Sequence, residues 1–174
     1  MRIKDKIKRP RRPVVAYEIL PPREKDGTLN SYAANISSLL SQTHIDAINI
    51  PEVRDEVARG ERPVKNQLRA EPRAFGRLLQ DIVGVEAIIN RVVVHQKLND
   101  ELKWLEETNK KYEIENLITV GGESRLIDYP GPSVNEALAA IKKNGNFNLL
   151  CGGISIPSRE KESLKLIEKS ENGS

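Results

Sequence analysis

Glu18 is the residue of this sequence best placed for acid–base chemistry. It closes an apolar run and is followed by Pro21 and Pro22, which cannot continue a central strand. Its carboxyl group should therefore be held at a strand end, where partial burial would favour the protonated form and suit a general acid. The same carboxylate could instead cap a turn or pair with Arg23 or Lys25. From the residues alone, both roles stay open.

Polar or small residues follow the later apolar runs in the same way, namely His95, Gly121, Gly122, Glu123 and Ser158. His95 can bind a ligand or be a satisfied structural residue, and one histidine does not support a metal site. Gly121 and Gly122 let the backbone approach a planar ring or a phosphate, although a tight turn also uses glycine. Barrel enzymes place their chemistry at such strand ends.

The elements that must position these residues alternate between strand and helix. Strands are expected near 14–19, 46–50, 87–94, 117–120 and 147–156, each followed by apolar residues at helical spacing. Asn99 and Ser158 are expected to cap helices. Ser133 with Glu136 predicts a capping box, and the amides of that helix start could also face a pyrophosphate. Five such units predict an α/β fold with parallel strands in the order 1-2-3-4-5 and the helices on the outer face.

Two fold types match this alternation, a doubly wound open sheet and a TIM barrel. A doubly wound dinucleotide-binding fold would carry a glycine-rich turn after the first strand, whereas residues 20–23 contain no glycine. We therefore predict a TIM-barrel type, incomplete in this chain because a full barrel needs eight units. Open sheet edges and an uncovered apolar inner face then predict a homo-oligomer or a larger complex, not an active monomer.

Composition places the chain among globular proteins. It has 174 residues, of which 38% are hydrophobic and 30% charged, and its single cysteine excludes an internal disulfide framework. No apolar run approaches the roughly 20 residues of a membrane span, and the N-terminus lacks the apolar stretch of a signal peptide. We expect a cytoplasmic protein with no membrane partner.

Charge divides the chain into a basic arm, residues 1–13, and a body, residues 14–174. Seven basic residues against one acidic residue give the arm +6, which leaves −3 for the body within a net charge of +3. The arm is expected to be a solvated tail, with phosphate binding as the alternative. An acidic body makes nucleic acid a weak candidate partner.

Several segments resemble, in order, the methylenetetrahydrofolate reductase family, whose members are flavin-dependent TIM barrels. Residues 17–23, Tyr-Glu-Ile-Leu-Pro-Pro-Arg, are similar to the Glu-x-x-Pro-Pro signature that ends the family's first strand. His95 follows the third strand, residues 117–123 resemble the family's Leu-Arg-Gly-Asp segment, and Tyr129 lies shortly beyond. Residues 154–160 resemble the turn after strand five.

This resemblance implies a chain that reduces 5,10-methylenetetrahydrofolate to 5-methyltetrahydrofolate in one-carbon metabolism. It implies non-covalent FAD, reloaded by NAD(P)H or another electron donor, and a folate-type substrate. Glu18 would assist protonation of the folate, which opens its five-membered ring to a cation that accepts hydride. The implied cofactor-binding residues are His95, Gly121, Gly122, Glu123, Tyr129 and Ser158.

The sequence also departs from the family pattern. Gly121 replaces the family's arginine, Glu123 its aspartate, and Pro51-Glu52 its threonine–tyrosine pair, while strands six to eight are absent. Three functions follow as alternatives. They are a flavin-dependent reductase, a non-catalytic relative that binds a partner through open barrel edges, and a basic-armed nucleic-acid-binding domain.

Overall fold

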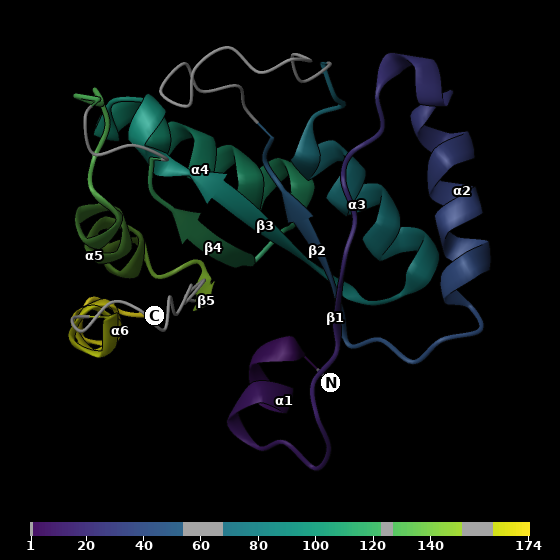
Figure 1. Ribbon diagram of the computed structural model, residues 1–174, viewed down its shortest axis with the longest axis horizontal. Coiled ribbons are helices and arrows are strands. Elements are labelled where there is room, and N and C mark those ends of the chain that lie inside the picture. Colours follow the sequence, from purple (N-terminus) through teal and green to yellow (C-terminus); the bar gives the residue numbers. More distant parts are fainter. Residues whose placement is uncertain (1, 54–67, 123–126, 151–161) are drawn as a thin grey trace.

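A single parallel sheet forms the centre of the computed structural model, which describes residues 2–53, 68–122, 127–150 and 162–174 (Figure 1). Its strands pair with their sequence neighbours in the order β1-β2-β3-β4-β5. They are β1 (Ala16–Glu18), β2 (Ala47–Pro51), β3 (Glu86–Val92), β4 (Asn116–Val120) and β5 (Asn148–Leu150). The predicted α/β class with parallel, sequentially ordered strands is confirmed. The part of the expected fifth strand beyond residue 150 lies outside the described residues.

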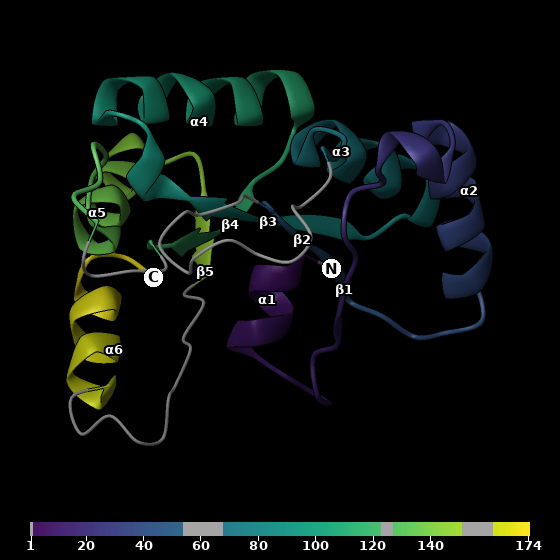
Figure 2. The same cartoon turned by 45° about the horizontal axis from the view of Figure 1, so that its top comes forward.

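One face of the sheet is covered by a layer of helices. These are α2 (Leu29–Leu40), α3 (Pro72–Val83), α4 (Leu98–Tyr112) and α5 (Val134–Asn144), and Figure 2 shows α3 and α4 above the sheet. Phe75, Leu79 and Leu105 of this layer pack on Ile48 and Ile50 of β2, together with Ile89 and Leu117 of the neighbouring strands. Burial of branched apolar residues at about 25 cal/mol per Å² is the main force that holds the layers together. None of the helices in the described ranges is long and apolar enough to cross a membrane.

Local signals fix most helix ends. The Ser133–Glu136 capping box that begins α5 is confirmed, and Gly84 and Gly145 end α3 and α5 in the left-handed conformation that favours glycine. The expected cap at Asn99 is wrong, because α4 starts at Leu98, two residues earlier than that cap predicts, and Lys97 takes the cap position without a side-chain bond. A last helix, α6 (Glu162–Glu171), follows a segment outside the described residues.

The opposite, inner face of the sheet carries both apolar and polar side chains. Ala47, Ile88 and Ile118 on this face form a small core with Ile3 and Val14. At the carboxyl end, alternation along the strands places Glu18, Asn49 and Asn90 on the same face. In the strand register, Ile88 lies level with Asn49 and Ile118 level with Asn90, so the polar residues of β2 and β3 adjoin the small core.

The basic arm is not the solvated tail that its composition predicts. Residues Ile3–Lys8 form helix α1, which lies beneath the sheet in Figure 2, and the Ile3 side chain is 1% exposed. The buried Asp46 carboxylate binds Lys6 Nζ at 2.9 Å and Arg12 Nη2 at 2.8 Å, and accepts the Val15 amide at 2.9 Å. The pairing of basic residues with this carboxylate anchors the arm to the start of β2.

Candidate functional site

Glu18 ends β1 on the inner face of the sheet. Ile48 and Ile50 pack into the helix-side core, so Asn49 between them faces the other way. Asn49 Nδ2 donates a hydrogen bond to Glu18 Oε2 at 3.0 Å, which places both side chains in one row. Glu18 is exposed, so the partial burial expected to favour its protonated form is absent.

The chain after Glu18 is held rigidly. Pro21 and Pro22 are buried, and their carbonyls accept hydrogen bonds from Arg69 Nη1 at 2.7 Å and from the Ala70 amide at 2.8 Å. Arg23, one of the two cations expected as a partner of Glu18, pairs with Asp26 instead. Its hydrogen bonds lower the pKa of that carboxyl to about 2. Among the described contacts, Asn49 is the partner of Glu18.

Two amide oxygens beside Glu18 lack the hydrogen bonds that buried polar atoms normally make. Asn49 Oδ1 and Asn90 Oδ1 are buried, and neither has a partner among the described residues; the third such atom is a donor, Arg69 Nε. A buried acceptor left unpaired costs about 1–3 kcal/mol, so native proteins rarely keep one without a reason. Two on adjacent strands, at the carboxyl edge of a parallel sheet, mark a place where a ligand with N–H or O–H donors can bind.

His95 and Tyr129 form a second part of this edge. β3 ends at Val92, and a short 3-10 turn, η3 (Val93–His95), carries His95 beyond the strand. The His95 and Tyr129 rings meet edge to face, with centroids 5.5 Å apart and an interplanar angle of 81°. The Gly131 amide donates to the Val94 carbonyl at 2.9 Å and holds the two segments together. Two aromatic rings from distant parts of the sequence thus meet just past the ends of the strands.

Gly122 lies under the Tyr129 ring. A Cβ atom at this position would sit 2.2 Å from Tyr129 Cε2, whereas a Cβ at Gly121 would meet only Val134 Cγ2, at 3.3 Å. The glycine after β4 therefore makes room for a ring of this chain.

The structure brings together part of the expected site. Gly122, Tyr129 and His95 form one cluster, and Glu18 with Asn49 forms another on the inner face. Glu123 and Ser158 lie outside the described residues. Ser133 is engaged as a cap, because its Oγ and amide both bond to Glu136 Oε2 at 2.8 Å.

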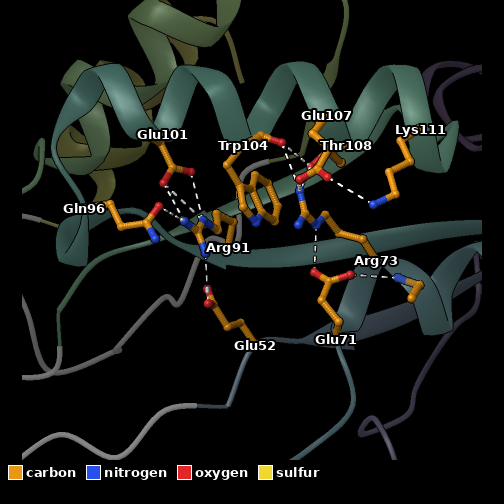
Figure 3. Close-up of polar contacts among 11 residues, drawn as sticks. Glu52, Glu71, Arg73, Arg91, Gln96, Glu101, Trp104, Glu107, Thr108 and Lys111 are labelled. Atoms are coloured by element: carbon orange, nitrogen blue, oxygen red, sulfur yellow. Dashed lines mark hydrogen bonds and ion pairs between the residues drawn. The ribbon is translucent and has the colours of Figure 1, made fainter.

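A buried ionic cluster on the helix side supports the same edge and was missed by sequence reasoning (Figure 3). Arg91 of β3 is 2% exposed and binds Glu101 of α4 at 2.7 Å, Glu52 at 2.9 Å and Gln96 Oε1 at 2.8 Å. Burial acts to lower the pKa of the Arg91 guanidinium, but the hydrogen bonds and charges of the two glutamates outweigh it and leave that pKa raised. Arg91 is therefore a permanent cation between two elements.

Glu52 ties this cluster to the end of β2. Its Oε2 accepts the Val92 amide at 3.0 Å, and its own amide donates to the Asn90 carbonyl at 3.0 Å. The cluster thus fixes the carboxyl ends of β2 and β3, the strands that carry Asn49 and Asn90.

Trp104 of α4 lies between two guanidinium groups in Figure 3. Arg91 Cζ lies 4.2 Å and Arg73 Cζ 4.6 Å from the ring centroid. Arg73 also binds Glu71 at 2.7 Å and Glu107 at 3.0 Å. Cation–π contacts that are shielded from water in this way stabilise the packing of α4 on the sheet.

Comparison with known proteins supports the fold. The structure is similar to a solved structure described as an uncharacterized protein from Clostridium thermocellum that binds two copies of 5-methyl-5,6,7,8-tetrahydrofolic acid. The TM-score is 0.71 and the sequence identity 19%; the match covers 98% of this chain but only 55% of that one. No protein-family model matches the sequence, and no curated protein matches it. At this identity the likeness shows a shared fold.

Proposed function

We propose that this chain binds a folate-type ligand on the inner face of its sheet, at the carboxyl ends of β1 to β3. The observation that carries the proposal is the group of polar side chains at that edge. Glu18 accepts a hydrogen bond from Asn49, and the buried Oδ1 atoms of Asn49 and Asn90 have no donor among the described residues. A pterin ring presents several N–H donors along one edge and suits such a group. The fold likeness to a protein that binds 5-methyltetrahydrofolate supports the same ligand class.

The architecture we propose is a TIM-barrel type. Its support is the sequential parallel strand order, the helices on one face, and the small apolar core that Ile3 of α1 forms with the other face. The chain spans about half the length of the solved structure it resembles, so the remaining strands would come from further polypeptide. We also propose that the chain is located in the cytoplasm.

The activity we propose is FAD-dependent reduction of methylenetetrahydrofolate. The described residues fit a flat aromatic cofactor, because the partly buried His95 and Tyr129 rings and the backbone of Gly121 lie together beyond β3 and β4. Bound FAD would supply a hydride, with NAD(P)H or another donor reloading it. Glu18 would hold and deliver a proton to a ligand nitrogen, and Asn49 would fix the direction of that carboxyl group.

Ligand binding and catalysis can be tested separately on the purified chain. We expect saturable binding of 5-methyltetrahydrofolate by calorimetry and a flavin absorption band after incubation with FAD. Glu18→Gln should keep ligand affinity within about threefold, because the amide oxygen still accepts from Asn49, while turnover falls at least about 100-fold. Absence of 5-methyltetrahydrofolate binding would contradict the proposed ligand class.

A second candidate is a folate-binding relative without flavin chemistry. The Tyr129 ring already covers Gly122, and Glu52 is committed to Arg91 at the position where the resembled family has a threonine–tyrosine pair. Binding of 5-methyltetrahydrofolate with no flavin uptake would favour this candidate over the reductase.

A further inference from the structure

Asn49 can offer a ligand its amide oxygen as an acceptor. One N–H of its Nδ2 group donates to Glu18 Oε2, and this contact fixes which end of the amide faces Glu18. The end left over is Oδ1, which is buried and without a partner among the described residues.

Asn90 Oδ1, on the next strand, is likewise buried and without a partner among the described residues. Asn49 is paired with Ile88, so Asn90 lies two residues further on the same face. With strands about 4.8 Å apart and a rise of about 3.3 Å per residue, the two Cα atoms are about 8 Å apart. Side chains from both can reach one bicyclic ring placed between them.

The ends of β2 and β3, which carry Asn49 and Asn90, are held in place from the helix side of the sheet. Glu52 bonds to the Asn90 carbonyl and the Val92 amide, and Arg91 anchors Glu52 to α4. A ligand site gains affinity when its groups are fixed before binding, because less conformational entropy is lost.

We propose that Asn49 and Asn90 are specificity-determining residues that select a heterocycle by its N–H donors, the 2-amino and ring N–H groups of a pterin. This inference rests on the proposed folate-type function. It adds which groups of the ligand the site recognises, namely the N–H donors on one edge of the ring. A ring with a carbonyl in place of the 2-amino group would bring its oxygen against an amide oxygen and be rejected.

The test uses two small ligands that differ at this one group, 6,7-dimethylpterin and 6,7-dimethyllumazine, titrated at pH 6.5 into the full chain. We expect the pterin to bind at least about tenfold more tightly than the lumazine. Equal affinity for the two ligands, or binding of neither, would overturn the inference.

Variants at Asn90 test the direction of the hydrogen bond. Asn90→Asp keeps only acceptors and should retain pterin binding, whereas Asn90→Leu should weaken it at least about tenfold and abolish the preference. Asn30→Leu replaces an exposed asparagine of α2, in the helix layer on the other side of the sheet, and is the matched control, expected to leave affinity unchanged. Circular dichroism verifies folding of each variant; a folded Asn90→Leu protein with wild-type preference would overturn the inference.

Failure of this inference can be told from failure of the proposed function. If 5-methyltetrahydrofolate binds but pterin and lumazine bind alike, the folate proposal stands and the acceptor pair is wrong. If pterin is preferred but methylenetetrahydrofolate is not reduced, the acceptor pair stands and the reductase is wrong.

Discussion

At the scale of single residues, buried charge has a large role in this chain. Asp46, Arg91 and Glu101 are each almost completely buried, and each is matched by opposite charges and hydrogen bonds. Burial of a charge is unfavourable unless an opposite charge is present. Removing one member of such a pair therefore leaves the other charge buried and unpaired. These positions are therefore more sensitive to substitution than the exposed helix pairs.

Arg91→Met should lower the free energy of unfolding by about 3–5 kcal/mol, because Glu101 is left buried without its cation. Arg91→Met combined with Glu101→Leu should recover much of the loss, since the stranded charge is then gone. Urea denaturation measures both. The control is Lys110→Ala, which removes an exposed pair with Glu106 and should change little. A double variant as unstable as the single one would contradict this account.

Asp46→Asn should lower the Tm by several degrees at pH 7, because Lys6 and Arg12 lose their shared anion and the arm is released. The Val15 amide and both cations hold the pKa of Asp46 well below its usual value near 4. A lowered pKa means that this carboxylate stabilises the fold above about pH 4 and loses its effect as the pH falls further.

The Tm difference between the wild-type chain and Asp46→Asn should therefore narrow between about pH 4 and pH 2. Asp100→Asn, at an exposed pair on α4, serves as the control and should show little difference at any pH. A difference that stays constant down to pH 2 would exclude the proposed role of the Asp46 charge.

At the scale of elements, the junction between the η3 turn and the segment before α5 is the most tightly built part of the candidate site. Gly122 lies under Tyr129, Tyr129 meets His95, and Gly131 approaches the Val93 carbonyl so closely that a Cβ would lie 2.6 Å from it. The turns after β3 and β4 are thereby joined into one surface.

Gly122→Ala should displace the Tyr129 ring, because the new methyl group would overlap it. We expect a changed near-ultraviolet circular dichroism spectrum and a shifted His95 ring resonance by NMR. Gly121→Ala is the matched control, since its methyl group would lie 3.3 Å from one Val134 methyl group and would not reach the Tyr129 ring. If both variants keep the wild-type spectra, the Tyr129 ring does not occupy that space.

The elements differ in how far the sequence predicts them. β-branched runs and caps such as Ser133–Glu136 are local, and they located the strands and helices well. The anchoring of the arm depends on Asp46, 34 residues beyond Arg12, and no local pattern reports such a pairing. Arg91, an arginine within an apolar strand, was the available signal for the buried cluster. Its partner Glu101 could not be identified before the packing of α4 was known.

At the scale of the whole molecule, β1 forms one edge of the described sheet. Within the described ranges β1 pairs with β2 alone, and Val15, just before β1, and Tyr17, within it, are 41% and 50% exposed. Edge strands with exposed apolar residues favour association with another chain.

We expect light scattering after size exclusion to show concentration-dependent association above the 19.5 kDa of one chain. Tyr17→Lys should shift the protein toward the monomer, because a charged side chain on an edge strand opposes pairing. Leu39→Lys, which replaces a 69% exposed leucine on α2, should have no such effect. A monodisperse monomer at all concentrations would refute the role of the β1 edge.

Trp104 is the single tryptophan of the chain, and its position between Arg73 and Arg91 has a practical consequence. Excitation at wavelengths that tyrosine does not absorb gives an emission signal from one site, at the contact of α4 with the sheet. Water that reaches the indole when α4 detaches would shift this emission to longer wavelength. The natural protein therefore carries its own optical probe, and stopped-flow fluorescence can time the docking of α4 without a label.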